Sequence, residues 1–72
     1  MKPNYTITSK VTPVKNGLVD FIADGYIDRD GERIPCKIGF TEFSDEPEVT
    51  HIFIKDGITE NGTHYDAETI EL

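Results

Sequence analysis

The stretch "DGYIDRDGERIPCKI" (residues 24–38) predicts a β-hairpin. Its centre, Asp30-Gly31, is a dipeptide typical of a two-residue type I′ turn. A turn at this dipeptide brings opposite charges together in three cross-strand pairs: Arg29 with Glu32, Asp28 with Arg33, and Asp24 with Lys37. Because such a pair contributes only about 0.2–1 kcal/mol, we interpret the three pairs mainly as a means of excluding slipped registers.

Further turn signals divide the rest of the chain into short runs rich in β-branched and aromatic residues. They are "KNG" (15–17), "SDEP" (44–47), "DG" (56–57) and "NG" (61–62). Regular spacing of this kind is typical of all-β folds. We expect one domain, residues 1–72, containing a small antiparallel meander of about five strands that forms a sheet or a partly closed barrel. The predicted strands cover residues 5–14, 18–29, 32–43, 49–56 and 63–71.

The first two turns predict the same inward face for the central strand, residues 18–29. A three-residue loop at Lys15-Asn16-Gly17, with Gly17 left-handed, sets Val11 opposite Phe21, Ile7 opposite Gly25 and Tyr5 opposite Ile27. The type I′ turn sets Phe21 opposite Phe40 and Ala23 opposite Ile38. A slip of one residue at either turn would turn the apolar set to the other face. The predicted core is Ile7, Val11, Phe21, Ala23, Ile27, Ile34, Cys36, Ile38 and Phe40.

Two prolines limit how the strands pair. In these registers Pro13 and Pro35 occupy positions at which the missing N–H would point away from the central strand. Proline is tolerated on the free side of a strand and not between two partners. We therefore expect the first and third strands to lack a second neighbour at these two positions.

The C-terminal third allows more than one interpretation. Asn61-Gly62 predicts a hairpin that sets Ile58 opposite Tyr65, Lys55 opposite Glu68 and Phe53 opposite Ile70, whereas Asp56-Gly57 competes as a turn. Alternatively, "YDAETIEL" (65–72) closes the chain as a short helix.

The second face of the central strand alternates apolar and acidic residues: Leu18, Asp20, Ile22, Asp24, Tyr26 and Asp28. Two interpretations fit this pattern. Either the last two strands fold back over the face, or the face binds a partner or a second copy, because contiguous exposed apolar area is typical of such sites.

The charge of the chain narrows the partners that we expect. Fourteen acidic residues against seven basic ones give a net charge of −7. Binding to nucleic acid requires Lys and Arg to neutralise phosphates, so we expect no nucleic-acid or membrane partner. A partner with a basic surface fits this charge, as does a simple role in solubility. A single cysteine and the lack of a long apolar run predict a soluble cytoplasmic protein.

The sequence lacks the residue patterns of common catalytic and metal-binding motifs. Cys36 could pair with His51 or His64 as nucleophile and base, but it lies on the predicted core face, where cysteine behaves as a small apolar residue. "DRDGE" (28–32) resembles the start of a calcium loop and lacks the remaining ligands. We expect no enzyme activity, no metal and no cofactor.

In size and charge alone, the chain is similar to small acidic proteins with which phages and mobile elements block host nucleases or polymerases. We expect a non-enzymatic inhibitor or adaptor that docks an acidic and apolar sheet face on a basic protein surface, with Tyr26 and Ile22 supplying most of the affinity. The alternative is a structural or assembly protein that associates with itself, as in a homodimer, through strand edges or the apolar face. The predicted partner-binding residues are Leu18, Asp20, Ile22, Asp24, Tyr26, Asp28, Asp45, Glu46 and Glu48.

Overall fold

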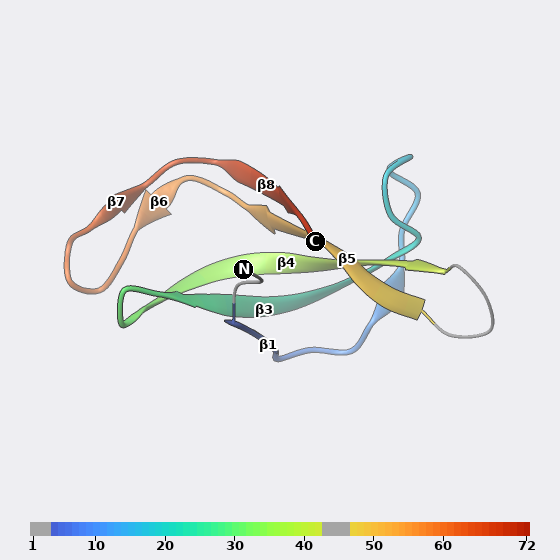
Figure 1. Ribbon diagram of the computed structural model, residues 1–72, viewed down its shortest axis with the longest axis horizontal. Helices are drawn as coiled ribbons and strands as arrows, with labels where there is room; N and C mark the ends of the chain where they lie inside the picture. The colour runs from blue at the N-terminus through green and yellow to red at the C-terminus, as the bar shows by residue number, and fades with distance from the viewer. Residues whose placement is uncertain (1–3, 43–46) are drawn as a thin grey trace.

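The computed structural model describes residues 4–42 and 47–72, and its elements there are all β-strands. The strands are β1 (Asn4–Ile7), β2 (Thr12–Pro13), β3 (Phe21–Arg29), β4 (Glu32–Glu42), β5 (Pro47–Ile54), β6 (Gly57–Ile58), β7 (His64–Tyr65) and β8 (Glu68–Glu71). The main sheet has the order β1-β3-β4-β5-β8, with β2 also paired to β3, and β6 and β7 form a separate pair (Figure 1). The predicted antiparallel meander is confirmed. The alternative C-terminal helix is wrong, because these residues include strand β8.

The sheet is strongly curled but open. Within the described residues, β1 and β8 are the first and last strands in the order of the sheet and do not pair with each other. The sheet therefore does not close into a barrel. β5, β8 and the β6–β7 pair arch over the hairpin of β3 and β4, which leaves the core on the concave side (Figure 1). Within residues 4–42 and 47–72, no helix is long and apolar enough to cross a membrane.

The hairpin of β3 and β4 has the predicted register along its whole length. Nine residue pairs run from Phe21 opposite Phe40 to Arg29 opposite Glu32. Asp30 and Gly31 have φ values of 52° and 79°, and two positive φ values are what a type I′ turn requires. The predicted pairs Gly25–Cys36 and Ala23–Ile38 are both present.

The first predicted strand is broken into β1 and β2, and its register changes between them. β1 pairs as predicted, with Tyr5 opposite Ile27 and Ile7 opposite Gly25. β2 is displaced by two residues, because Pro13, and not Val11, lies opposite Phe21. Between the two strands the Ser9 hydroxyl accepts a hydrogen bond of 2.8 Å from the N–H of Asp24. A side chain thus replaces a backbone acceptor there, which lets the chain bulge.

The loop before β3 is longer than predicted. The N–H of Val14 donates to the carbonyl of Asp20 at 3.0 Å, so the loop covers residues 15–19 in place of 15–17. Gly17 is left-handed, as expected, with φ 81°. Since side chains alternate with a period of two, a displacement of two residues leaves each side chain on its predicted face.

The last hairpin differs from its predicted register by one residue. Ile70 lies opposite Ile52 and Thr69 lies opposite Phe53. The turn explains the slip, because Glu60-Asn61-Gly62 is a three-residue loop with Gly62 at φ 86° and a hydrogen bond of 2.9 Å from the N–H of Thr59 to the carbonyl of Thr63. The slip changes which residues of β8 share a face with those of β5, so Ile70 lies on the inward side with Ile52.

The core lies on the concave face of the sheet. Its buried members are Ala23, Ile27, Ile34, Cys36, Ile38, Phe40, Ile52 and Ile54, with Phe21 half-buried against them. Six predicted residues are therefore confirmed as buried, and Ile52 and Ile54 were missed because the predicted core drew only on the first three strands. Ile7 and Val11 were expected in the core but are 38% and 43% exposed. They precede the central hairpin on an edge that nothing else in the described chain covers.

The expectation for the two prolines is confirmed. β5 pairs with β4 only between Lys37 and Glu42, so Pro35 borders β3 alone. Pro13 likewise pairs only with Phe21 of β3. The pairing of β4 with β5 also contains a bulge between Gly39 and Phe40.

Candidate docking surface

The convex side of the sheet, opposite the core, carries four of the nine predicted partner-binding residues. We call it the outer face. It is formed by Ile22, Asp24, Tyr26 and Asp28 of β3, Arg33, Pro35, Lys37 and Gly39 of β4, and His51 and Phe53 of β5. β5 and β8 extend the sheet beside β4. The interpretation in which the last two strands fold back over this face is therefore wrong.

The loop of residues 15–19 covers one end of the outer face. Val19 is only 4% exposed, and it sits over Gly39, where an added Cβ atom would lie 2.8 Å from both Val19 Cγ1 and Phe53 Cε2. The Asn16 side-chain oxygen holds the loop, because it accepts hydrogen bonds of 2.9 Å from the N–H groups of Leu18 and Val19. Sequence reasoning missed Val19 because the predicted central strand began at residue 18, which placed Val19 in the strand and not in the loop. The hydrogen-bonding capacity of Asn16 could have indicated the longer loop, because an asparagine side chain can bond the backbone N–H two residues on.

Leu18 and Asp20, which flank Val19, differ in their surroundings. Leu18 is 51% exposed. The Asp20 carboxylate accepts a hydrogen bond of 3.0 Å from the N–H of Glu42. The backbone N–H of Asp20 donates to the carbonyl of Phe40 at 2.8 Å. Asp20 therefore ties the loop to β4, a structural role that the sequence did not predict.

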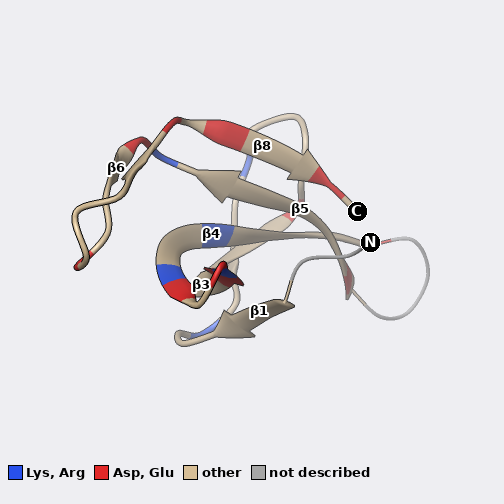
Figure 2. Ribbon diagram, turned by 60° about the vertical axis from the view of Figure 1, so that its left-hand side comes forward, with Lys and Arg blue, Asp and Glu red and all other residues tan. Residues whose placement is uncertain are grey.

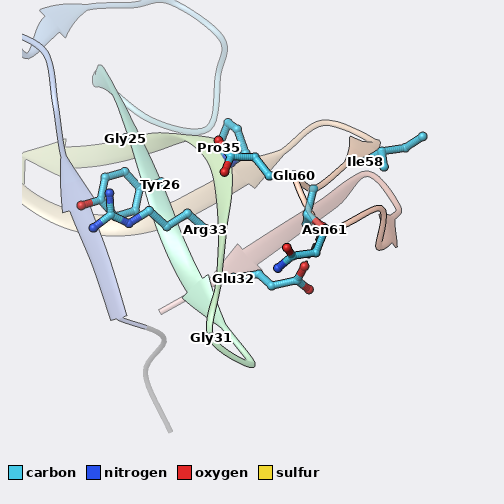
Figure 3. A pocket seen from close by; sticks show the side chains of 10 residues that line it. Gly25, Tyr26, Gly31, Glu32, Arg33, Pro35, Ile58, Glu60 and Asn61 are labelled. Atoms are coloured by element: carbon cyan, nitrogen blue, oxygen red, sulfur yellow. Dashed lines mark hydrogen bonds between the residues drawn. The ribbon is translucent and has the colours of Figure 1, made fainter.

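Tyr26 lies near the middle of the outer face, half-buried beneath an arginine. The guanidinium carbon of Arg33 is 4.5 Å from the centroid of the Tyr26 ring, and Figure 3 shows the two side chains lying against each other. Asp28 and Arg33 are opposite in register, as predicted. The Arg33 guanidinium, however, lies over the Tyr26 ring. A cation over an aromatic face is attracted by the ring quadrupole.

The other two predicted charge pairs have different outcomes. Lys37 and Asp24 form the expected ion pair on the outer face. Both side chains are more than half exposed, so the pair adds little stability. Arg29 is opposite Glu32 in register, but its guanidinium bonds Glu68 of β8 at 3.1 Å. Figure 2 shows acidic residues on β8 and basic residues on β4.

A groove opens beside the outer face, where the hairpin of β6 and β7 approaches β4. Its volume is about 580 Å³, and its wall includes Tyr26, Arg33, Pro35, Ile58 and Asn61 (Figure 3). The hairpin is held by the Glu32 carboxylate, which accepts hydrogen bonds from the hydroxyls of Thr59 at 2.7 Å and Thr63 at 3.2 Å. The bond from Thr59 is the main reason that the pKa of Glu32 is lowered from its ordinary value.

The remaining predicted binding residues are not brought together with Tyr26. Glu48 is exposed near the start of β5, opposite Thr41. Asp45 and Glu46 lie outside the described residues. The outer face thus combines Ile22, Tyr26 and the paired charges. That the acids of residues 45–48 contribute to binding stays a prediction.

The groups that we considered for catalysis are spread over the fold. Cys36 is buried in the core, and this burial raises the pKa of its thiol. His51 stacks on Phe53 with ring centroids 5.9 Å apart, and its Nδ1 is 2.8 Å from the Thr50 hydroxyl. His64 is exposed on β7. Within the part of the chain that the structure describes, no three His, Cys, Asp or Glu residues gather as a metal site. No protein-family model, curated protein or solved structure matches this chain.

Proposed function

We propose that this protein is a non-enzymatic binding module, an inhibitor or adaptor that docks its outer face on a basic surface of another protein. The observation that carries the proposal is the position of Ile22 and Tyr26. They lie on the convex side of the sheet, which β5 and β8 leave uncovered, in a chain of net charge −7. Apolar groups rimmed by charged residues on an exposed face are typical of protein interaction sites.

Tyr26 is the anchor of the proposed interface. Its ring is held between neighbouring strands, with Pro35 opposite in register and the guanidinium of Arg33 over it. A ring that is already ordered loses little conformational entropy on binding, which favours affinity. Tyrosine and arginine are also among the residue types that are enriched at binding hot spots.

Charge in this proposal acts mainly on the approach of the partner. Asp24 is neutralised locally by Lys37, and Asp20 is engaged by the N–H of Glu42. We therefore assign steering to the exposed acids Asp28 and Glu48 together with the overall charge, because a net negative field accelerates encounter with a basic partner. Ile22 and Tyr26 supply the affinity after contact.

Affinity capture from a lysate of the source organism tests the proposal. Immobilised wild type is compared with Tyr26→Ala and with Val11→Ala, which removes an exposed apolar side chain away from the outer face. We expect a partner that wild type and Val11→Ala retain and that Tyr26→Ala loses, with a cost of about 2 kcal/mol or more in the titrated complex. The same complex should weaken as salt rises, because exposed charges are screened.

Thermal unfolding of each variant is the control for this comparison, since Tyr26 is half-buried. A Tyr26→Ala protein that melts like the wild type and still binds every captured partner would contradict the proposal. If Tyr26→Ala is unfolded, binding is measured with Arg33→Ala in its place. That variant uncovers the Tyr26 ring and leaves the packing of the ring against the sheet.

A further inference from the structure

One edge of the sheet is open and uncharged. In the described part of the chain β1 has β3 on one side and no strand on the other, and it forms the lower margin of the molecule in Figures 1 and 2. The N–H of Thr8 donates to the carbonyl of Asp24 at 2.8 Å, which identifies a hydrogen-bonded position. Bonded and non-bonded positions alternate along an antiparallel pair. The N–H and C=O groups of Tyr5 and Ile7 therefore point outward, away from β3.

The side chains of the same two residues are also exposed. Tyr5 is 37% and Ile7 is 38% exposed, on the same side of the sheet as the core. An edge strand with free backbone groups and apolar side chains is a template for pairing with another strand. β1 has none of the usual protection, since residues 4–9 include no charge and no proline.

The opposite edge differs in its charge. β8 carries Glu68 and Glu71 within four residues. Two copies that met through β8 would gather four carboxylates along one short contact, where like charges repel. In a chain of net charge −7, β1 is thus the edge at which two copies can pair without acids in the contact.

We propose that the protein forms a two-fold symmetric dimer in which β1 pairs antiparallel with β1 of a second copy. Tyr5 lies opposite Ile7 of the second copy, Ile7 lies opposite its Tyr5, and Thr6 lies opposite its Thr6. This register uses both outward-facing residues of each copy, whereas centring the axis on Ile7 would bring Tyr5 against the bulge at Ser9. The contact is isologous and closes at two copies.

This arrangement extends the proposed function without requiring it. A two-fold axis perpendicular to the joined sheet keeps both outer faces on the same side. Tyr26 is opposite Thr6 in register, so three strand spacings separate the two Tyr26 residues, about 14 Å in all. The dimer would therefore present two Tyr26–Arg33 anchors to one partner surface.

Sedimentation measurements on wild type and two proline variants test the dimer. Ile7→Pro removes an outward N–H from β1. Its matched control is Thr69→Pro, which removes an outward N–H from β8, since the bond from Leu72 N–H to the Thr50 carbonyl places Thr69 at a non-bonded position. Over about a hundredfold range of concentration, we expect wild type and Thr69→Pro to reach twice the chain mass of 8.1 kDa, and Ile7→Pro to stay at the monomer mass.

A cross-linking experiment tests the register and does not depend on a proline variant folding. Thr6 residues at a non-hydrogen-bonded pair have Cα atoms about 4.5 Å apart, which a disulfide can span. With oxidised glutathione as oxidant, Thr6→Cys should give a covalent dimer that reducing agent reverses. Thr69→Cys, on the other edge, should stay monomeric on a denaturing gel.

Two results would overturn the dimer. One is a constant monomer mass of the wild type at every concentration, and the other is equal cross-linking of Thr6→Cys and Thr69→Cys. Salt separates this inference from the proposed function. Screening of the −7 charge on each copy should strengthen the dimer, whereas it should weaken binding to a basic partner. A protein that stays monomeric and still loses its partner on Tyr26→Ala would refute only the dimer.

Discussion

The hydroxyl of Thr59 donates a hydrogen bond of 2.7 Å to the carboxylate of Glu32. Thr59 lies in the hairpin of β6 and β7, and Glu32 is the first residue of β4. The same Thr59 hydroxyl oxygen accepts a bond of 3.0 Å from the N–H of Thr63. One carboxylate therefore holds the second, smaller pair of strands against the end of the main hairpin.

This contact predicts a loss of stability in acid. The folded-state pKa of Glu32 is lower than 4.5, first because of the bond from Thr59. The unfolded chain therefore takes up this proton before the folded protein does as the pH falls. The contribution of Glu32 to the free energy of unfolding is complete above about pH 4.5 and is lost as the pH falls through the folded-state value. Urea unfolding from neutral pH to about pH 3 should show this loss in wild type and much less of it in Glu32→Gln.

Substitutions at Thr59 supply the control for that prediction. Thr59→Ser keeps the hydroxyl and should keep the acid dependence, whereas Thr59→Val removes the donor and should reduce it as Glu32→Gln does. If Thr59→Val and Thr59→Ser show the same dependence on pH, the bond between Thr59 and Glu32 is not its source.

Gly39→Ala should destabilise the protein by about 1–3 kcal/mol, the usual cost of overpacking. The new Cβ atom would lie 2.8 Å from Val19 Cγ1 and 2.8 Å from Phe53 Cε2, so the loop that covers one end of the outer face or the Phe53 ring must shift. Chemical unfolding of Gly39→Ala, Val19→Ala and the double variant measures the coupling. We expect the double variant to lose less than the sum of the two single losses, because removing the Val19 side chain relieves part of the overlap. Additive losses would mean that the two residues do not meet.

Asn16→Ala should lower the free energy of unfolding by about 1 kcal/mol, the net value of a typical intramolecular hydrogen bond. It removes the oxygen that accepts from the N–H groups of Leu18 and Val19. Asn16→Asp keeps an oxygen at this position and should remain close to wild type. Melting curves of the two variants recorded side by side make the comparison, and equal losses would show that the acceptor is not what matters.

Ile38→Ala should cost about 2–5 kcal/mol, because it opens a cavity in the core. Ile38 is fully buried and lies between Ala23 of β3 and Ile52 of β5. Ile58→Ala makes the same chemical change at a residue that is 58% exposed, and it should stay within about 0.5 kcal/mol of wild type. Urea midpoints of the two variants decide this, and similar losses would place the core elsewhere.

The pairing of β3 with β4 was predictable from the sequence because it is decided locally. Asp30-Gly31 adopts the positive φ values that a type I′ turn needs, and the apolar residues on both sides alternate in step with that turn. Local turn chemistry and hydrophobic pattern therefore agree on one register, and a slip in either would bury charge. All nine pairs of this hairpin follow from these two facts.

The errors lie where a second conformation of similar local cost existed. Asn61-Gly62 is compatible with a two-residue or a three-residue loop, and the choice between them sets Glu71 or Ile70 opposite Ile52. The three-residue loop sets Ile70 opposite Ile52, where it packs against the core, and lets Thr59 reach Glu32. Only contacts with β4, distant in sequence, distinguish the two loops energetically.

The sequence by itself thus determined the all-β class, the central hairpin with its inward set from Ala23 to Phe40, and the alternation that leaves Ile22 and Tyr26 outward. The tertiary structure alone decided that β5 and β8 extend the sheet beside β4, that Val19 covers Gly39, and that β1 is an open edge among the described residues. The physical reason is how far apart in the sequence the interacting residues are. Turn geometry and alternation act between neighbours in the chain, whereas the curl of the sheet and the covering of its faces depend on the summed burial of residues far apart in the sequence.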